Sequence, residues 1–216
     1  MLHVIPRQKD SACYINSEGR LFLPAPTLDS LKWKHGTAIA LAYLADPLTL
    51  LLRDDADGNG FTLMRRAGPT NTQSPRGVVT CTGFTNGVLR SRVALPLRNI
   101  KPIVLKNATH KLALQLEAPT WTREEFSQAG RQNVPPGAKG VYQLLDANEQ
   151  VLRIGEGAIN SRIGQHLKNS EFISAVRYFR YYSLADKEEM QIFEQVLLAN
   201  YEMSAGKLPV LNTLHG

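Results

Sequence analysis

Six residues in the last third of the chain are of the types that act on phosphate esters. Hydrolysis of such an ester needs an aimed and partly deprotonated water, neutralised phosphate charge and a stabilised leaving oxygen. A phenol or an imidazole can handle the proton, guanidinium groups bind phosphate, and a carboxylate holds a hard cation such as Mg²⁺. The candidates are Tyr142, Arg153, Arg162, His166, Glu194 and Asn212.

Tyr142 and His166 are the candidates for proton transfer. A free phenol has a pKa of about 10 and is a poor base at neutral pH. We therefore expect the charges of Arg153 and Arg162, with a metal-bound water, to favour the ionised phenol. The alternative for Tyr142 is a core tyrosine whose hydroxyl is satisfied, because it lies in an otherwise apolar run. A structural role is the alternative for His166.

Glu194 is the candidate metal ligand, and Arg162 is the candidate clamp on the phosphate. Met190, Leu197 and Leu198 lie three or four residues from Glu194, so its carboxylate borders an apolar helix face. An unpaired charge there is costly, and a metal ion would offset that cost. A glutamate that reaches water at the helix edge is the alternative. Asn212 is expected to support the site by fixing a loop.

The surrounding pattern predicts the elements that carry these side chains. Apolar runs at 140–145 and 151–155, separated by a polar turn, predict a β-hairpin. A helix follows from about residue 160, and an aromatic strand is expected over 176–184. Asp186 begins a second helix, with Glu189 three residues on as in a capping box, and this helix is expected to run to about Met203.

In this order the motifs resemble those of the GIY-YIG nucleases. Gly140-Val141-Tyr142 stands where that family has GIY, and Arg153-Ile154-Gly155 stands where it has YIG. The other four candidates match the family's arginine and histidine of the first helix, its metal-binding glutamate and its closing asparagine. The resemblance implies a small sheet of about three antiparallel strands flanked by helices, with Mg²⁺ (or Mn²⁺) as cofactor. It also implies endodeoxyribonuclease activity.

One position departs from the motif. Arg153 replaces the second tyrosine, and arginine cannot act as a base because it stays protonated. It can still bind phosphate or hold a water or tyrosine oxygen. The nearby Gly155-Glu156-Gly157 is superficially like a dinucleotide-binding loop, but the third glycine is misplaced and no parallel βαβ unit follows.

The positive charge lies in the other part of the chain. Residues 1–120 hold 15 lysines and arginines against eight aspartates and glutamates, a balance of +7, out of a total of +6 for the chain. Nucleic acid is the usual partner of such a surplus, because neutralised phosphates release counterions. A solvated basic surface without a partner is the alternative.

The N-terminal part reads as β-rich. Strands are expected at 20–23, 37–44 and 48–53, the last forming a hairpin with 61–64 across the acidic loop 54–60. The segment 20–24 recurs faintly as 92–96, an internal repeat. Residues 15–51 resemble the AbrB-type swapped-hairpin DNA-binding domains, in which two halves form a barrel. The candidate DNA contacts are Arg20, Arg65, Arg66, Arg76, Arg90, Arg92 and Arg98.

These observations predict an α+β protein with three parts. Residues 1–118 are expected to form a basic, β-rich, barrel-like DNA-binding domain, 119–138 a linker with a short helix at about 122–132, and 139–216 the GIY-YIG nuclease domain. No apolar run is long enough to span a membrane, and no secretory signal is recognisable, so a cytoplasmic protein is expected. Cys13 and Cys81 form neither a disulfide framework nor a zinc motif.

The expected function is therefore metal-dependent, sequence-specific cleavage of double-stranded DNA, as in a restriction enzyme. Homing and repair nucleases are alternatives of the same class. A non-catalytic DNA-binding regulator with a degenerate nuclease domain is the alternative of a different class. One active site cuts one strand at a time, so cutting both strands requires a homodimer or two successive nicks.

Overall fold

The computed structural model describes residues 12–58, 60–66, 76–81, 85–106 and 108–213. The chain divides into two compact units, Met1–Ala118 and Pro119–Gly216, which are described separately here. Both units combine helices with antiparallel sheets, so the chain has a mixed α+β fold. No helix in the described ranges is long and apolar enough to cross a membrane.

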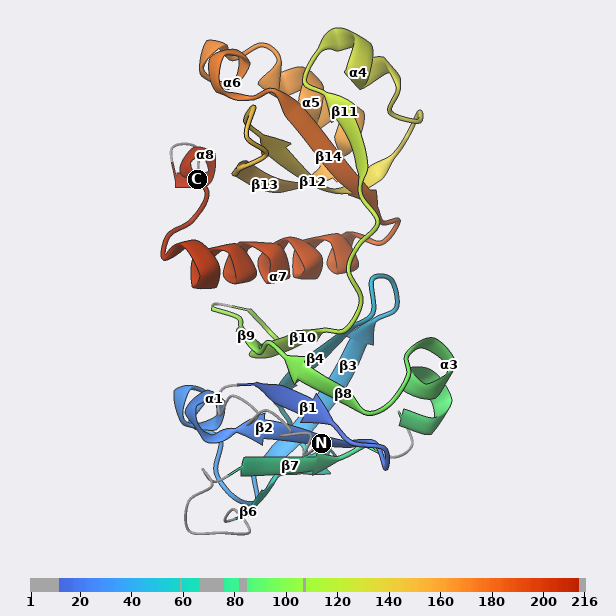
Figure 1. Cartoon of the computed structure of the whole chain (residues 1–216), viewed down its shortest axis with the longest axis vertical. Helices are drawn as coiled ribbons and strands as arrows, with labels where there is room; N and C mark the ends of the chain where they lie inside the picture. The colour runs from blue at the N-terminus through green and yellow to red at the C-terminus, as the bar shows by residue number, and fades with distance from the viewer. Residues whose placement is uncertain (1–11, 59, 67–75, 82–84, 107, 214–216) are drawn as a thin grey trace, which may run out of the picture. The chain divides into compact units, whose positions relative to one another are not determined.

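The first unit contains two five-stranded antiparallel sheets (Figure 1). One sheet has the order β6 (Met64–Arg66), β7 (Arg76–Thr80), β2 (Arg20–Pro24), β1 (Cys13–Ile15) and β8 (Leu97–Ile100). The other has the order β5 (Phe61–Thr62), β3 (Ala38–Leu44), β4 (Thr49–Asp54), β10 (Leu112–Gln115) and β9 (Ile103–Val104). The helical segments are α1 (Ala25–Ser30), a π-helical turn at Thr85–Leu89, and α3 (Arg90–Arg92). The hydrophobic core is built from both sheets and includes Ile15, Leu21, Trp33 and Leu50.

The structure confirms the three strands expected near residues 20, 40 and 50, but it pairs them differently. The expected hairpin between β4 and the residues near 61 is wrong, because β4 pairs with β3 on one edge and β10 on the other. Strand β5 pairs instead with β3. In the acidic loop, a side-chain oxygen of Asp55 accepts a hydrogen bond from the Gly60 amide, so this residue closes a turn.

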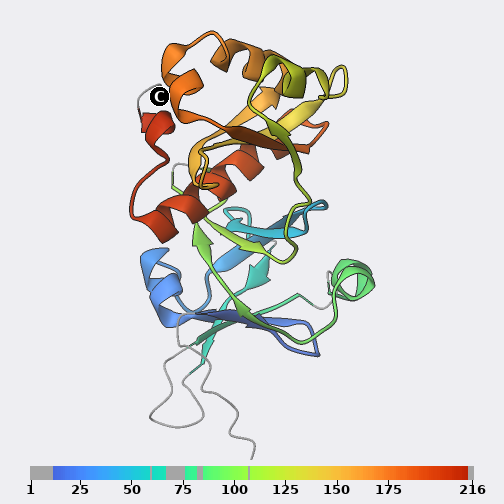
Figure 2. The same ribbon diagram turned by 45° about the horizontal axis from the view of Figure 1, so that its top comes forward.

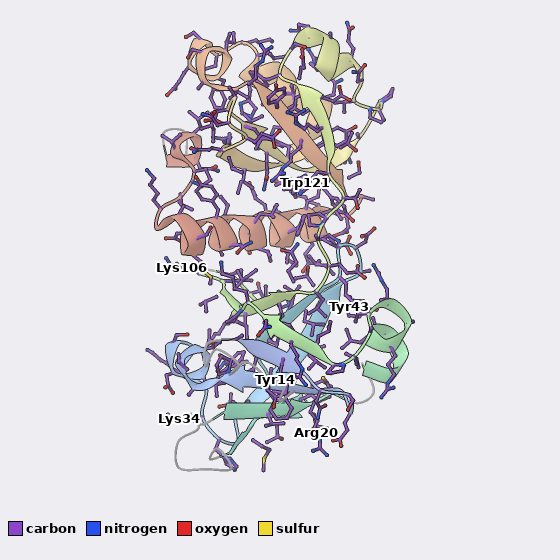
Figure 3. The ribbon with its side chains drawn as sticks, in the orientation of Figure 1. Tyr14, Arg20, Lys34, Tyr43, Lys106 and Trp121 are labelled. Atoms are coloured by element: carbon purple, nitrogen blue, oxygen red, sulfur yellow. The ribbon has the colours of Figure 1, made fainter. Side chains whose placement is uncertain are left out.

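The similarity of 92–96 to 20–24 does not extend to their structure. Residues 20–24 form β2, whereas Arg90–Arg92 is helical and the next strand begins at Leu97. The expectation of a barrel-like domain is not met, because the described strands form two separate sheets and no closed barrel. Figure 3 labels Tyr14 and Arg20 in the first of these sheets, where the Tyr14 ring stacks on Phe22 with centroids 4.1 Å apart.

The second unit is built on one four-stranded antiparallel sheet. Its order is β11 (Thr122–Glu125), β14 (Tyr178–Ser183), β12 (Lys139–Leu145) and β13 (Val151–Ala158), so β13 is an edge strand. Helices α4 (Gln128–Gln132), α5 (Ile159–His166) and α6 (Ser170–Ala175) lie on one face, and α7 (Lys187–Ala205) lies on the other (Figures 1 and 2). A short helix, α8 (Val210–Thr213), contacts β13.

Local sequence accounts for the main elements of this unit. Asp146 closes the turn between β12 and β13, because its Oδ1 accepts hydrogen bonds from the Asn148 and Gln150 amides at 2.8 Å each. Helix α7 begins as predicted at its Asp186 cap, whose Oδ1 accepts from the Glu189 amide at 2.9 Å. It ends at Gly206, whose φ of 73° is the left-handed conformation that favours glycine.

The segment expected to be a linker belongs to the second unit. Its predicted helix over 122–132 is only partly present, because Thr122–Glu125 forms β11 and pairs with β14. Helix α4 then begins at Gln128, after Ser127, whose hydroxyl accepts from the Gly130 amide at 3.1 Å. Strand β11 gives the sheet four strands instead of three. Trp121, labelled in Figure 3 just before β11, lies edge-on to Tyr182.

Candidate active site

Tyr142 and His166 meet on the face of the sheet that α5 covers. Tyr142 lies in β12 and is fully buried, and its hydroxyl is 2.8 Å from Nε2 of His166. His166 lies in the last turn of α5, and its ring stacks on Phe172 with centroids 4.5 Å apart. The phenol therefore has a partner that can accept its proton.

The protonation of Tyr142 differs from the sequence-based expectation. Burial raises the pKa of Tyr142 above its ordinary value of 10, and this effect exceeds the lowering caused by Arg153 and Arg162. The charge of Glu194 raises the same pKa further. The phenol is thus neutral at neutral pH, so the two arginines alone do not supply a phenolate.

Arg153 of β13 and Arg162 of α5 approach the same region. Nη1 of Arg153 donates a hydrogen bond to the Leu211 carbonyl at 2.5 Å, and its Nε is buried without a hydrogen-bond partner among the described residues. Nε of Arg162 donates to the Glu156 carbonyl at 3.1 Å. Both guanidinium groups influence the pKa of Tyr142 and the pKa of Glu194, so they lie within electrostatic reach of both.

Glu194 comes from the opposite face of the sheet. It lies in α7, whose Phe193 ring contacts Tyr182 edge-on at 5.8 Å. Burial raises the pKa of Glu194 from an ordinary value of 4.5 to about 7, with a further rise from Glu156. Arg162 and Arg153 act in the lowering direction on this pKa.

Glu156 is a site residue that sequence reasoning missed. It lies in the segment Gly155-Glu156-Gly157, which superficially resembles a dinucleotide-binding loop. Its carboxylate raises the pKa of Glu194. In the register of the sheet Glu156 pairs with Val141, and Gly155 pairs with Tyr142. Because side chains alternate along a strand, Glu156 lies on the face that α7 covers. The alternation of side chains along the predicted strand 151–155, continued to residue 156, is the sequence signal that could have identified Glu156.

Helices α5, α7 and α8, which carry groups from both faces, all contact the edge strand β13. A Cβ on Gly155 would lie 2.5 Å from the Tyr142 hydroxyl, so glycine is required for the tyrosine to occupy its place. On the outer edge, Asn212 pairs with Ile154 through both side-chain atoms: Oδ1 accepts from its amide and Nδ2 donates to its carbonyl, each at 2.8 Å. Asn212 therefore has the supporting position expected of it.

The acidic residues present suit a cation that keeps most of its water. No group of three or more histidine, cysteine, aspartate or glutamate side chains gathers among the described residues. Glu156 is close enough to Glu194 to disfavour the charge of the Glu194 carboxylate. Mg²⁺ is commonly held by one or two carboxylates plus substrate phosphate oxygens, so this donor set fits it.

The candidate DNA-binding arginines of the first unit do not share one element. Arg20, Arg65, Arg66, Arg76 and Arg98 lie in the β6–β7–β2–β1–β8 sheet, whereas Arg90 and Arg92 lie in α3. Arg92 forms an ion pair with Glu117 at 2.6 Å, and Arg20 one with Glu18 at 3.2 Å. Arg90 donates to the Ser17 carbonyl, and Arg98 is exposed. The side chains of Arg65, Arg66 and Arg76 lie outside the described part.

Comparisons with protein-family models, curated proteins and solved structures found no match to this chain. Its function must therefore be argued from the chemistry of its own residues.

Proposed function

We propose that this protein is a metal-dependent DNA endonuclease of the GIY-YIG type that hydrolyses phosphodiester bonds. The observation that carries the proposal is the 2.8 Å distance between the Tyr142 hydroxyl and Nε2 of His166, within electrostatic reach of Arg153 and Arg162. A buried phenol, two guanidinium groups and a partly buried carboxylate supply the functions that phosphate hydrolysis needs.

In this mechanism His166 and Tyr142 act together on the attacking water. The Tyr142 hydroxyl, 2.8 Å from Nε2 of His166, takes a proton from the water as it passes its own proton to the imidazole. The water oxygen attacks phosphorus, and the bond from phosphorus to the leaving oxygen breaks. The leaving oxygen keeps the electron pair of that bond and takes up a proton from solvent. This relay removes the need for a phenolate in the resting protein, which burial of Tyr142 disfavours.

The arginines and carboxylates balance charge around the phosphate. Arg162 and Arg153 neutralise the growing negative charge, and the unpartnered Nε of Arg153 is a donor suited to an anion. Glu194, with Glu156 beside it, would hold Mg²⁺ (or Mn²⁺), and the bound cation supplies a Lewis acid for the phosphate oxygens. Arg153 thus contributes charge where the motif has a tyrosine.

Double-stranded DNA is the proposed substrate. The surplus of +7 in residues 1–120 supports a nucleic-acid partner, bound by arginines of the first unit. Sequence preference and a restriction role form the finer part of the proposal, and homing and repair nucleases are the related alternatives. The proposed setting is the cytoplasm.

A non-catalytic DNA-binding regulator is the second candidate. Two observations favour it: Arg153 replaces a tyrosine of the motif, and the Tyr142 phenol is buried and neutral. The presence of Tyr142, Arg162, Glu194 and Asn212 together, in the order of the motif, weighs against it.

Cleavage of supercoiled plasmid separates the two candidates. Wild-type protein is incubated with plasmid in Mg²⁺, in Mn²⁺ and in EDTA, beside Glu194→Ala and the control Glu188→Ala, an exposed glutamate of the same helix. Discrete fragments that need metal and vanish only in Glu194→Ala support the nuclease. Retarded DNA without cleavage in either metal supports the regulator. Linear DNA that forms without a preceding nicked circle would indicate a homodimer, whereas nicked circles that precede linear DNA would indicate two successive nicks.

A further inference from the structure

Helix α5, which carries Arg162 and His166, is tied to α4 by a reciprocal pair of side chains. Nε of Arg131 donates hydrogen bonds to both oxygens of Asn160, the carbonyl at 3.1 Å and Oδ1 at 2.9 Å. Asn160 returns a hydrogen bond from Nδ2 to the Arg131 carbonyl at 3.2 Å. Three hydrogen bonds thus join one residue of α4 to the first turn of α5.

The helix surface is shaped to receive the arginine. A Cβ on Gly164 would lie 2.8 Å from Cζ of Arg131, so the guanidinium lies directly against α5 one turn beyond Asn160. Nη1 of Arg131 also donates to Gln128 at 3.3 Å, within α4. A larger residue at position 164 would displace the guanidinium, because the nearest atoms are those of the guanidinium itself.

Helix α4 is itself fixed to the sheet. A Cβ on Gly130 would lie 2.1 Å from the Glu125 carbonyl oxygen, so α4 approaches β11 as closely as a backbone allows. Strand β11 is in turn hydrogen-bonded to β14. Arg131 therefore links α5 to the sheet along a path that does not pass through the active-site side chains.

Helix α5 needs such a link. It has only eight residues, and no side chain caps its first turn at Ala158. An isolated helix of this length is unstable in water, so tertiary contacts must set its position. His166, at the far end, is 2.8 Å from the Tyr142 hydroxyl, and displacement by about 1 Å can cost about 100-fold in rate.

We propose that Arg131 is a positioning residue for the reaction, which acts through Asn160 to hold α5 so that His166 meets Tyr142 and Arg162 faces the phosphate. The inference rests on the proposed nuclease function. The part that concerns the position of His166 can be tested without a DNA-cleavage assay.

The test uses the full-length protein with three variants and one control. Arg131→Ala removes the link, and Arg131→Lys keeps the charge but not the planar guanidinium. Gly164→Ala displaces the guanidinium, because the three atoms nearest to the added Cβ all belong to it. The control is Arg123→Ala, an arginine of the same unit that forms an exposed ion pair with Glu149. We expect Arg131→Ala and Gly164→Ala to lower kcat by about 10- to 100-fold with KM for duplex DNA within threefold.

Two further results are expected. Arg131→Lys should recover only part of the loss, because lysine lacks the fork that reaches both oxygens of Asn160. The ¹⁵N chemical shift of the His166 imidazole, which reports its hydrogen bond to Tyr142, should move in Arg131→Ala and Gly164→Ala and stay in place in Arg123→Ala.

The inference is overturned if kcat in both Arg131→Ala and Gly164→Ala stays within twofold of the control and the imidazole shift is unchanged. If Arg131→Ala does not fold, Gly164→Ala decides the matter at a temperature below its own Tm. If wild-type protein cuts no DNA, the proposed function fails, and the imidazole shift still decides whether Arg131 positions His166.

Discussion

Replacing Glu194 by glutamine should stabilise the protein at alkaline pH while abolishing its proposed activity. Glutamine keeps the size of the side chain and removes its charge. Burial and Glu156 raise the pKa of Glu194 to about 7, so the folded protein disfavours the ionised carboxylate. An active-site residue whose loss increases stability would indicate that the site is built to receive a positive charge.

The magnitude follows from the shift in pKa. Each unit of pKa shift corresponds to about 1.4 kcal/mol. Because Glu194 is only partly buried, solvent screens part of this effect. The ionised carboxylate therefore lowers the free energy of unfolding by about 2 kcal/mol. Between pH 4.5 and pH 7 the folded protein holds a proton that the unfolded chain has released. Stability is therefore lost as the pH rises through this window, and the whole cost is present above pH 7.

Thermal unfolding at pH 5 and pH 8 measures the effect. At pH 8 Glu194→Gln should unfold about 4–8 °C above wild type, and at pH 5 the two should nearly coincide. Glu188→Gln, an exposed position in α7, should show no comparable growth of its effect with pH. Mg²⁺ at ten times its Kd should stabilise wild type by about 1.4 kcal/mol and leave Glu194→Gln unchanged.

The reasoning is refuted if Glu194→Gln is equally or less stable than wild type at pH 8. Equal stabilisation of both proteins by Mg²⁺ would show that the ion binds elsewhere. These measurements need no DNA substrate.

Three other substitutions test separate parts of the site. Tyr142→Phe should abolish cleavage while lowering the free energy of unfolding by only about 1 kcal/mol, since it removes one buried hydrogen bond, to His166; retained cleavage would exclude the proton relay. Gly155→Ala places a methyl group against the Tyr142 hydroxyl and should cost about 1–3 kcal/mol in chemical denaturation, together with activity; a fully active and stable variant would contradict this contact. Asn212→Ala should lower the free energy of unfolding by about 1–3 kcal/mol, because the backbone amide and carbonyl of Ile154 lose their partner. Hydrogen exchange at the Ile154 amide should become faster. Unchanged exchange would show that other groups protect this amide.

Elements fixed by local chemistry could be predicted from the sequence. Helix α7 is bounded by the Asp186 cap and by Gly206, and both signals depend only on neighbouring residues. The hairpin of β12 and β13 likewise follows from two apolar runs and the turn at Asp146. The candidate residues of the site lie on these elements, on α5 and on α8, in the order in which the motif arranges them along the chain.

Features that depend on distant pairing could not be predicted. The residues of β11 form a strand because they hydrogen-bond to an otherwise unpaired edge of β14. No pattern within Thr122–Glu125 predicts this pairing. The expected pairing of β4 with the residues near 61 failed for the same reason, since β10 occupies that edge of β4 from about sixty residues away. The neutral state of Tyr142 is also a tertiary effect, because burial outweighs the nearby arginines.

The outer side of β13 has a consequence for association between molecules. An edge strand offers unpaired amides and carbonyls to any other strand, and proteins commonly block such positions. Here the side chain of Asn212 takes both polar groups of Ile154, and Arg162 takes the carbonyl of Glu156. The residues that frame the reaction thus also occupy the positions to which a foreign strand would add, so their loss would leave this border open to aggregation.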